Sequence, residues 1–471
     1  MFGDDLFLTP SQRAVWEDAG LWTDLYHPDA VFIAWTAGRN PVVCFDLFVR
    51  EVPFGGAYLV AAGITAALRF ITRFQYAHQS LELLRDLGYP NAYLNELAGL
   101  RFTGDVAAVP EGRLVFPGEP LLRVIAPFRE ALVLEAGVLQ AINTATLIAT
   151  KAARIVQAAA GRPVAEFGIR RAHAPLVASY AAQLGGCAST SFLAAASAFD
   201  LRASGTIPHA LVELFEGEVE AFRAVAVAHE QFRLLLDTYD TLHAATIAVQ
   251  VGHWARTELG HELVAVRLDS GDLDYFSRRV RALLDAGSFP MTQIVASGDL
   301  DEWKIADLVA RGAPIDAFGV GTALVNGLGS LEHQAQGGAL GGVYKLAWVA
   351  AEDGHRSHAA LKLADEKTTL PGIKMVARAS DFSRDLVQLE EEPLLAGFVP
   401  LLLPAIKTGS LTAPFGRDTL VSAAARRQVD LVALPEPWRM LVPALPYPVE
   451  VSSQLQALRN QAAAQITGDK N

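Results

Sequence analysis

Three loops in the second half of the chain carry residues that could bind a phosphate group. Each loop follows a short apolar run: residues 264–268 lead into Asp269-Ser270-Gly271-Asp272, residues 294–296 into Ser297-Gly298-Asp299, and residues 315–318 into Gly319-Val320-Gly321-Thr322. Small residues let backbone N–H groups approach an anion, and a helix N-terminus after such a loop favours negative charge. The repetition of Ser-Gly-Asp, followed by Gly-x-Gly-Thr, therefore indicates one phosphate-binding rim built from successive strand ends.

An aromatic residue and two arginines follow an earlier expected strand, residues 164–167, in the order Glu166-Phe167-Gly168-Ile169-Arg170-Arg171. A guanidinium fork can bind a carboxylate or a phosphate through paired hydrogen bonds. The ring of Phe167 offers a flat face for an aromatic ligand. A surface salt bridge is the alternative interpretation of such an arginine pair.

One histidine stands where a helix is expected to begin. His209 follows Ser204-Gly205-Thr206-Ile207-Pro208, and the helix is expected from about residue 210. An imidazole nitrogen can carry a phosphoryl group, and a helix N-terminus favours an anion. A capping or surface histidine is the alternative. Three acidic residues on the following helix are candidates to orient the ring, although a solvated face explains them too: Glu213, Glu216 and Glu218.

A single arginine interrupts an apolar strand beside several carboxylates. Arg267 lies on the opposite face of that strand from the neighbouring valines, where it could meet a ligand or form a buried structural ion pair. Carboxylates beside a phosphate site would repel the anion unless they bind sugar hydroxyls or Mg²⁺. Asp269, Asp272 and Asp299 are therefore candidate metal ligands, while Asp272 and Asp299 could instead be helix N-caps.

The elements that must position these residues alternate from about residue 143. Strands are expected at 164–167, 232–236, 264–268, 294–296 and 315–318, and helices at 144–160, 175–184, 189–199 and 211–229, with a further helix ending at residue 259. Such alternation means parallel strands with crossover helices. It favours an irregular, closed α/β barrel, with an open sheet as the alternative.

The segments before and after this region do not show the regular alternation of strands and helices. Short strands at 42–49, 113–116 and 121–125 alternate with helices near the N-terminus, and the chain after residue 345 has short strands and Pro-rich turns. We expect the C-terminal segment to pack back on the N-terminal part. The predicted domains are residues 1–142, an α/β sandwich; residues 143–345, the catalytic α/β barrel; and residues 346–471, the returning segment.

Composition excludes several classes of function. The chain has 471 residues, 51% hydrophobic and 19% charged, with a formal net charge of −12, which argues against a nucleic-acid partner. Cys44 and Cys187 are too few for a disulfide framework or a zinc cluster. Acidic Asp4 and Asp5 do not suit a signal peptide, and no apolar run approaches ~18 residues without interruption. We therefore expect a cytoplasmic protein without a membrane span.

Taken together, these segments resemble the nicotinate phosphoribosyltransferases, in the type II phosphoribosyltransferase group. The resemblance covers nearly the whole chain and rests on motifs in the family's order: Thr23-Asp24-Leu25-Tyr26, Val52-Pro53-Phe54-Gly55-Gly56, Glu166 to Arg171, Gly205 to His209, Leu236-Asp237-Thr238-Tyr239-Asp240-Thr241, Val266 to Asp272, Phe318 to Thr322 and Gly341-Gly342-Val343-Tyr344-Lys345-Leu346. It implies an irregular α/β barrel with an α/β sandwich domain. It also implies a homodimer whose active sites are shared between subunits.

The resemblance implies a reaction and assigns residues to it. Nicotinate and phosphoribosyl pyrophosphate would give nicotinate mononucleotide, the first step of NAD salvage from nicotinate, coupled to hydrolysis of ATP with Mg²⁺ as cofactor. His209 matches the histidine that ATP phosphorylates. Thr206 and Arg267 match positions that contact nicotinate, and Tyr26 matches a tyrosine that reaches the pyridine ring from the neighbouring subunit. With Phe167 beneath the ring, these residues form the expected nicotinate site.

The phosphoribosyl pyrophosphate site is expected in the glycine-rich loops. Thr322, Gly319 and Gly321 match the loop that holds the 5′-phosphate in the family, and Ser297 and Gly298 adjoin it. Arg171 is also expected to bind phosphoribosyl pyrophosphate. Two further residues complete the expected catalytic set with His209: Arg171, placed with His209 at a second anion site, and Asp269, placed toward the substrate.

Two departures from the family pattern leave alternatives open. Ile207-Pro208 precedes the histidine and Ala210 follows it, where the family often has Met-Ala and Ser, and His27-Pro28-Asp29 replaces the common Glu-Leu-Thr. An inactive barrel that binds a metabolite is one alternative. A nicotinamide-using relative is another, but such enzymes tend to carry a small residue where this chain has Arg171, which favours the acid.

Overall fold

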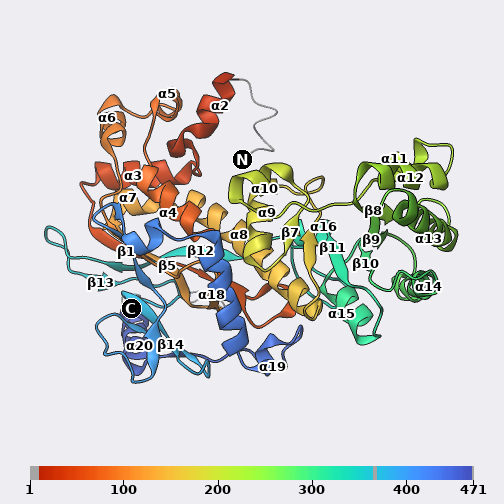
Figure 1. Cartoon of the computed structure of the whole chain (residues 1–471). Coiled ribbons are helices and arrows are strands. Elements are labelled where there is room, and N and C mark those ends of the chain that lie inside the picture. The colour runs from red at the N-terminus through yellow and green to blue at the C-terminus, as the bar shows by residue number, and fades with distance from the viewer. Residues whose placement is uncertain (1–9, 364–368, 469–471) are drawn as a thin grey trace. The chain divides into compact units, whose positions relative to one another are not determined.

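The computed structural model describes residues 10–363 and 369–468, so Asp4 and Asp5 lie outside the described residues. The chain forms two compact units (Figure 1). One contains the chain up to Thr150 together with the chain from Gly329, and the other contains Lys151–Leu328. The long helix α8, Glu135–Ala158, belongs to both. The three predicted domain boundaries stay a prediction.

The unit formed by Lys151–Leu328 is built on a six-stranded parallel sheet, which Figure 1 shows with its helices around it. The strand order is β7 (Ser189–Thr190), β6 (Val164–Glu166), β11 (Ala317–Val320), β10 (Gln293–Ala296), β9 (Glu262–Leu268) and β8 (Gln231–Leu235). The sheet is a curled half-barrel, which confirms the irregular α/β barrel class. The expected closure is wrong for the described residues, because β7 and β8 form the two edges.

Helices connect these strands in the expected alternation. They are α9 (Pro175–Leu184), α10 (Leu193–Phe199), α11 (His209–Glu213), α12 (Glu218–Ala228), α13 (Thr241–Glu258), α14 (Leu273–Ala286), α15 (Glu302–Ala310) and α16 (Thr322–Val325). Helix α14 illustrates the principle, since Ser277, Val280 and Leu284 are buried at helical spacing. That face packs against the sheet strands β9 and β10.

Two expected helices are wrong in their extent. The segment 189–199 starts as strand β7, because Ser189 and Thr190 pair with β6 and the Thr190 hydroxyl donates to the buried carboxylate of Glu166. The segment 211–229 is two helices, α11 and α12, interrupted before the extended N-cap Gly217. Strand pairing and a backbone break overrode the helical pattern in these segments.

Among its described residues the other unit contains three sheets, the smallest a two-stranded pair of β2 (Leu59–Val60) and β4 (Leu114–Val115). A seven-stranded antiparallel sheet has the order β13 (His358–Ala359), β12 (Gly342–Val349), β1 (Val42–Val49), β5 (Pro120–Pro127), β3 (Asp105–Ala108), β17 (Leu403–Lys407) and β18 (Ser410–Leu411). A four-stranded sheet contains β16 (Phe398–Pro400), β14 (Lys374–Ala379), β15 (Asp385–Leu389) and β19 (Val449–Val451). The pairing of β17 with β3 joins C-terminal to N-terminal sequence in one sheet, as the fold class requires.

Among the described residues, one helical segment, which contains α7 (Phe128–Leu132) and α8, is long and apolar enough to cross a membrane by length and composition alone. Charged residues interrupt this 31-residue segment, and the expected absence of a membrane span stays a prediction. Within its most apolar window, 56% is buried inside the structure. Burial of this extent is typical of a core helix.

Candidate active site

One cavity of ≈ 200 Å³ lies where four parallel strands end. The chain leaves β6, β9, β10 and β11 at this edge and supplies the lining residues Phe167, Gly168, Arg170, Arg171, Arg267, Asp269, Ser297, Gly298, Asp299, Gly319, Gly321 and Thr322. The carboxyl ends of parallel strands meet at one edge, so residues far apart in sequence come together. This brings the three predicted loops and the Phe167–Arg171 segment to one site.

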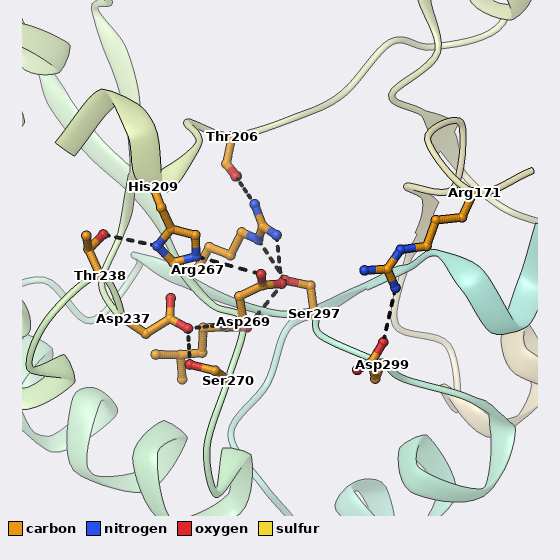
Figure 2. A network of polar contacts seen from close by, with 11 residues as sticks. Arg171, Thr206, His209, Asp237, Thr238, Arg267, Asp269, Ser270, Ser297 and Asp299 are labelled. Atoms are coloured by element: carbon orange, nitrogen blue, oxygen red, sulfur yellow. Dashed lines mark hydrogen bonds and ion pairs between the residues drawn. The ribbon is translucent and has the colours of Figure 1, made fainter. Parts of the chain in front are cut away.

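Arg267 is held in a single orientation by three hydrogen bonds, shown in Figure 2. Its Nε donates to the Ser297 hydroxyl at 2.7 Å, and its Nη1 donates to the Thr206 hydroxyl at 3.0 Å. Its Nη2 donates to Oδ1 of Asp269 at 2.7 Å. A guanidinium has five N–H donors, so two remain for an anionic ligand.

Asp269 is the centre of this polar network (Figure 2). Its Oδ1 also accepts a hydrogen bond from Ser297 at 2.6 Å, and its backbone N–H donates to Oδ2 of Asp237 at 3.0 Å. Partial burial pushes the pKa of Asp269 up, but the bond from Ser297 and the charge of Arg267 outweigh it and hold the pKa below its ordinary value. Asp269 is therefore an anion at neutral pH.

His209 is the first residue of α11 and points toward Asp269 (Figure 2). Its Nδ1 lies 3.2 Å from the hydroxyl of Thr238, and its Nε2 lies 3.8 Å from Oδ2 of Asp269. The imidazole side chain is 40% exposed, so one nitrogen has access to a phosphoryl donor. Asp269 and Thr238 orient the ring, instead of the glutamates suggested on the following helix.

The opposite side of the cavity holds the arginine of the Phe167–Arg171 segment. Nη1 of Arg171 donates to the Thr322 hydroxyl at 2.7 Å and lies 3.6 Å from Oδ1 of Asp299. Figure 2 shows Arg171 and His209 at separate ends of the network. Arg171 therefore contacts the Thr322 loop, while His209 contacts Thr238 and Asp269, and the second anion site expected near these two residues stays a prediction.

Two glycines in the cavity wall make room for neighbouring atoms. A Cβ on Gly298 would lie 1.8 Å from the backbone oxygen of Asp269, and its φ of +89° is a left-handed conformation. A Cβ on Gly319 would lie 2.4 Å from the Phe167 ring. Gly298 keeps two loops in contact, while Gly319, predicted as part of the phosphate loop, lies within β11 and accommodates the aromatic ring.

The buried carboxylate of Glu166 holds the backbone turn that carries the Phe167 ring. Glu166 accepts hydrogen bonds from the Gly168 backbone N–H and from the hydroxyls of Ser179 and Thr190. These contacts fix the turn that carries Phe167, whose ring centroid lies 5.9 Å from Cζ of Arg267. Sequence reasoning did not assign this supporting role to Glu166.

The candidate metal ligands separate into different structural roles. Asp272 is the N-cap of α14 and accepts from the Tyr275 backbone N–H at 3.0 Å, which confirms the alternative prediction that it caps a helix. Asp299 is not a cap, because Asp301 caps α15. Within residues 10–363 and 369–468, no group of three or more His, Cys, Asp and Glu side chains is arranged to hold a metal ion.

Tyr26 begins helix α3, Tyr26–Thr36, in the other compact unit. The tyrosine is 56% exposed, and its ring centroid lies 4.0 Å from that of the buried His27. Burial of part of the phenol, together with Glu135 and Asp24, raises the pKa of Tyr26. An exposed aromatic at this place suits contact with another molecule, and its predicted role stays a prediction.

Sequence reasoning missed one polar contact of the histidine. Thr238 lies in the loop after β8, one strand along from Asp269, and its hydroxyl meets His209. Its position after a parallel strand was the available signal, because the segments that follow β6, β9, β10 and β11 at this edge also carry site residues.

The fold and the cavity define a class of protein, an α/β half-barrel with a polar cavity at the carboxyl ends of its strands. A family model described as the nicotinate phosphoribosyltransferase N-terminal domain matches residues 21–143. A nicotinate phosphoribosyltransferase of Mycobacterium tuberculosis is 39% identical over 92% of each chain. The human enzyme of that name is 32% identical over 94% of this chain and 96% of its own.

A solved structure extends the comparison to three dimensions. The crystal structure of human nicotinic acid phosphoribosyltransferase matches with a TM-score of 0.80 at 30% identity, over 93% of this chain and 99% of that chain. The chain belongs to the nicotinate phosphoribosyltransferase family.

Proposed function

We propose that this protein forms nicotinate mononucleotide from nicotinate and phosphoribosyl pyrophosphate, coupled to ATP hydrolysis through phosphorylated His209. The observation that carries the proposal is one cavity lined by an aromatic face, Phe167, a fixed cation, Arg267, and the small-residue loop ending at Thr322. Nicotinate is a planar carboxylate, and its partner carries a phosphate. The cavity offers a complementary group for each.

The residues of the cavity divide between the two substrates. Phe167 provides the ring face, and the two remaining donors of Arg267 meet the carboxylate. On the other side, Arg171 and Thr322, with the backbone of Gly298, hold the 5′-phosphate. The substrates are thereby aligned before they react.

The transfer step forms a bond from the pyridine nitrogen to C1 of the ribose while the bond from C1 to pyrophosphate breaks. Its transition state has oxocarbenium character, so positive charge develops on the ribose. The anionic carboxylate of Asp269 stabilises that charge, and the rest of the catalysis comes from alignment.

The ATP step uses the histidine of the network. A nitrogen of His209 attacks the γ-phosphorus of ATP, the bond to ADP breaks, and phosphohistidine forms. Asp269 lies 3.8 Å from Nε2 and stabilises a protonated or phosphorylated ring by its charge. Hydrolysis of the phosphohistidine then drives an otherwise poorly favoured transfer forward.

Mg²⁺ is the cofactor that we propose with these anionic substrates. The site fits this ion, because Oδ1 of Asp237 is a buried oxygen without a hydrogen-bond partner and lies in the network of Asp269. Magnesium is commonly held by one or two carboxylates together with substrate phosphates. When bound, it would neutralise charge on the pyrophosphate leaving group, and Asp237 and Asp269 would hold it.

We also propose a cytoplasmic homodimer with shared sites. The support is the exposed ring of Tyr26, which the family resemblance assigns to a neighbouring subunit. Light scattering of the purified protein tests the oligomeric state, and a monomer at catalytic concentrations would contradict the proposal.

The proposed activity is tested by product formation. Purified protein with nicotinate, phosphoribosyl pyrophosphate, ATP and Mg²⁺ should yield nicotinate mononucleotide, separated by chromatography. Parallel reactions with nicotinamide should yield little product, since the amide offers no negative charge to Arg267. Absence of product from nicotinate would defeat the proposal and favour a metabolite-binding barrel, and preference for nicotinamide would favour the alternative substrate.

A further inference from the structure

We propose that Glu302 is a positioning residue for the loop Ser297–Asp299, held in place by Lys151 and Arg154. The inference rests on the proposed function, because that loop lines the cavity where the phosphate of phosphoribosyl pyrophosphate is expected. Glu302 itself does not line the cavity. It therefore acts through the structure that presents the loop.

The loop depends on the first turn of α15, the helix that follows it. The side chain of Asp301 caps this turn by accepting from the backbone N–H groups of Trp303 and Lys304. Nζ of Lys304 reaches back and donates to the backbone oxygen of Asp299 at 2.8 Å. Any displacement of the start of α15 therefore displaces the backbone at Asp299.

A buried ionic cluster fixes the start of α15. Glu302, the first residue of that helix, is fully buried. Its Oε2 lies 2.5 Å from Nζ of Lys151, and its Oε1 accepts from Nε of Arg154 at 3.2 Å. Both cations come from α8 and are themselves buried. Cζ of Arg154 also lies 5.5 Å from the ring centroid of Trp303, the next residue of α15.

Such a cluster is better suited to orientation than to net stability. Removing charges from water costs free energy that the ion pairs only partly recover, so a well-packed apolar substitute is often as stable. The directional contacts among Glu302, Lys151 and Arg154, however, restrict the position of the N-terminal end of α15. The cluster therefore fixes the position of the loop Ser297–Asp299.

The other side of the same loop has no freedom to compensate. The backbone N–H of Ser297 donates to Leu268 at 2.8 Å, and Gly298 lies against the backbone of Asp269. The loop is thus held between strand β9 and helix α15. A shift of about 1 Å at either support would reduce alignment of the bound phosphate.

The test compares Glu302→Gln with wild type, using Glu262→Gln as the matched control. Glu262 pairs with Arg256 on the surface at the end of β9 remote from the cavity, so its substitution leaves the loop unchanged. Calorimetric titration with ribose 5-phosphate measures the phosphate site without catalysis. We expect Glu302→Gln to weaken this binding and raise the KM for phosphoribosyl pyrophosphate about tenfold or more, with the KM for nicotinate within about twofold of wild type.

Two further variants keep the test decisive if Glu302→Gln alone folds poorly. Lys151→Met combined with Glu302→Gln removes an opposite pair of charges together, which limits the loss of stability. Lys304→Met removes the exposed hydrogen bond to the backbone oxygen of Asp299. It should also raise the KM for phosphoribosyl pyrophosphate, by a smaller factor, without raising the KM for nicotinate.

Unchanged binding of ribose 5-phosphate in folded variants would overturn the inference, as would an equal rise in both KM values, which indicates general loosening. If wild-type protein binds no ribose 5-phosphate and forms no mononucleotide, the proposed function itself fails.

Discussion

Oδ2 of Asp269 lies 3.8 Å from Nε2 of His209. The second oxygen of the same carboxylate accepts from Arg267, so one acid touches both the proposed phosphoryl carrier and the proposed nicotinate cation. This relationship places the two chemical steps side by side. It also makes Asp269 the residue whose change should affect both steps.

The variant Asp269→Asn tests this shared role. Asparagine keeps one oxygen for Arg267 but loses the negative charge that His209 and the developing ribose cation face. We expect kcat for mononucleotide formation to fall on the order of 100-fold, together with the rate of ATP hydrolysis. Asp240→Asn is the matched control, because Asp240 caps α13 and asparagine caps equally well. Loss of only one of the two rates would contradict the shared role.

Gly298→Ala tests the contact between the loops. The new methyl group would collide with the backbone of Asp269 in a left-handed conformation, so the loop must shift. We expect a loss of unfolding free energy of about 1–3 kcal/mol and a raised KM for phosphoribosyl pyrophosphate.

Gly312→Ala is the control that separates the effect of backbone strain on stability from the effect of moving the loop Ser297–Asp299. Gly312 has a φ of +68° with open space around it, so alanine costs roughly 1–2 kcal/mol of conformational strain without moving the site. Enzyme assays and thermal denaturation of both variants make the comparison. An equal KM in the two variants would show that the Gly298 contact does not position the phosphate loop.

Part of the candidate site could be predicted from the sequence. Arg267 and Ser297 meet as the strand-end argument implied, because parallel strands deliver their loops to one edge. Thr206, which the family resemblance placed in the nicotinate site, accepts a hydrogen bond from the same arginine. Asp299 was one candidate for the N-cap of α15, but Asp301 caps that helix, since sequence does not reveal how many residues a loop uses before its helix. The buried cluster of Glu302 had no sequence signal, because charges on a helix ordinarily face water.

A pH dependence of stability follows from a buried acid in the other unit. Glu119 accepts from the Phe116 backbone N–H and faces Asp385, which is paired with Arg378. Burial, reinforced by the charge of Asp385, raises the pKa of Glu119 well above its ordinary value. The folded protein therefore keeps a proton that the unfolded chain releases.

The sign of the effect is a loss of stability with rising pH. The contribution is complete below the ordinary carboxyl pKa of about 4.3 and declines as pH rises toward the folded pKa. Glu119→Gln retains a neutral hydrogen-bond donor, so its melting temperature should decline less between about pH 5 and pH 9. Parallel slopes for the two proteins in thermal denaturation would contradict the protonated state.

Shared active sites predict complementation between inactive variants. Tyr26→Ala and His209→Ala should each have little ATP-coupled activity, but mixed dimers contain one site with both native residues. An equal mixture, unfolded and refolded together, should recover about a quarter of wild-type activity by random pairing. Activity no greater than the mean of the two parents would argue that each subunit carries a complete site.

In the proposed mechanism, phosphate on His209 couples ATP hydrolysis to mononucleotide formation. Incubation of wild-type protein with ATP and Mg²⁺, followed by mass spectrometry, should find phosphate on His209. Addition of nicotinate and phosphoribosyl pyrophosphate should discharge it as mononucleotide forms. His209→Ala should lack the phosphate and ATP hydrolysis while retaining slow transfer. Phosphate absent from His209 in the wild type, or ATP hydrolysis surviving in His209→Ala, would show that ATP hydrolysis is not coupled through this histidine.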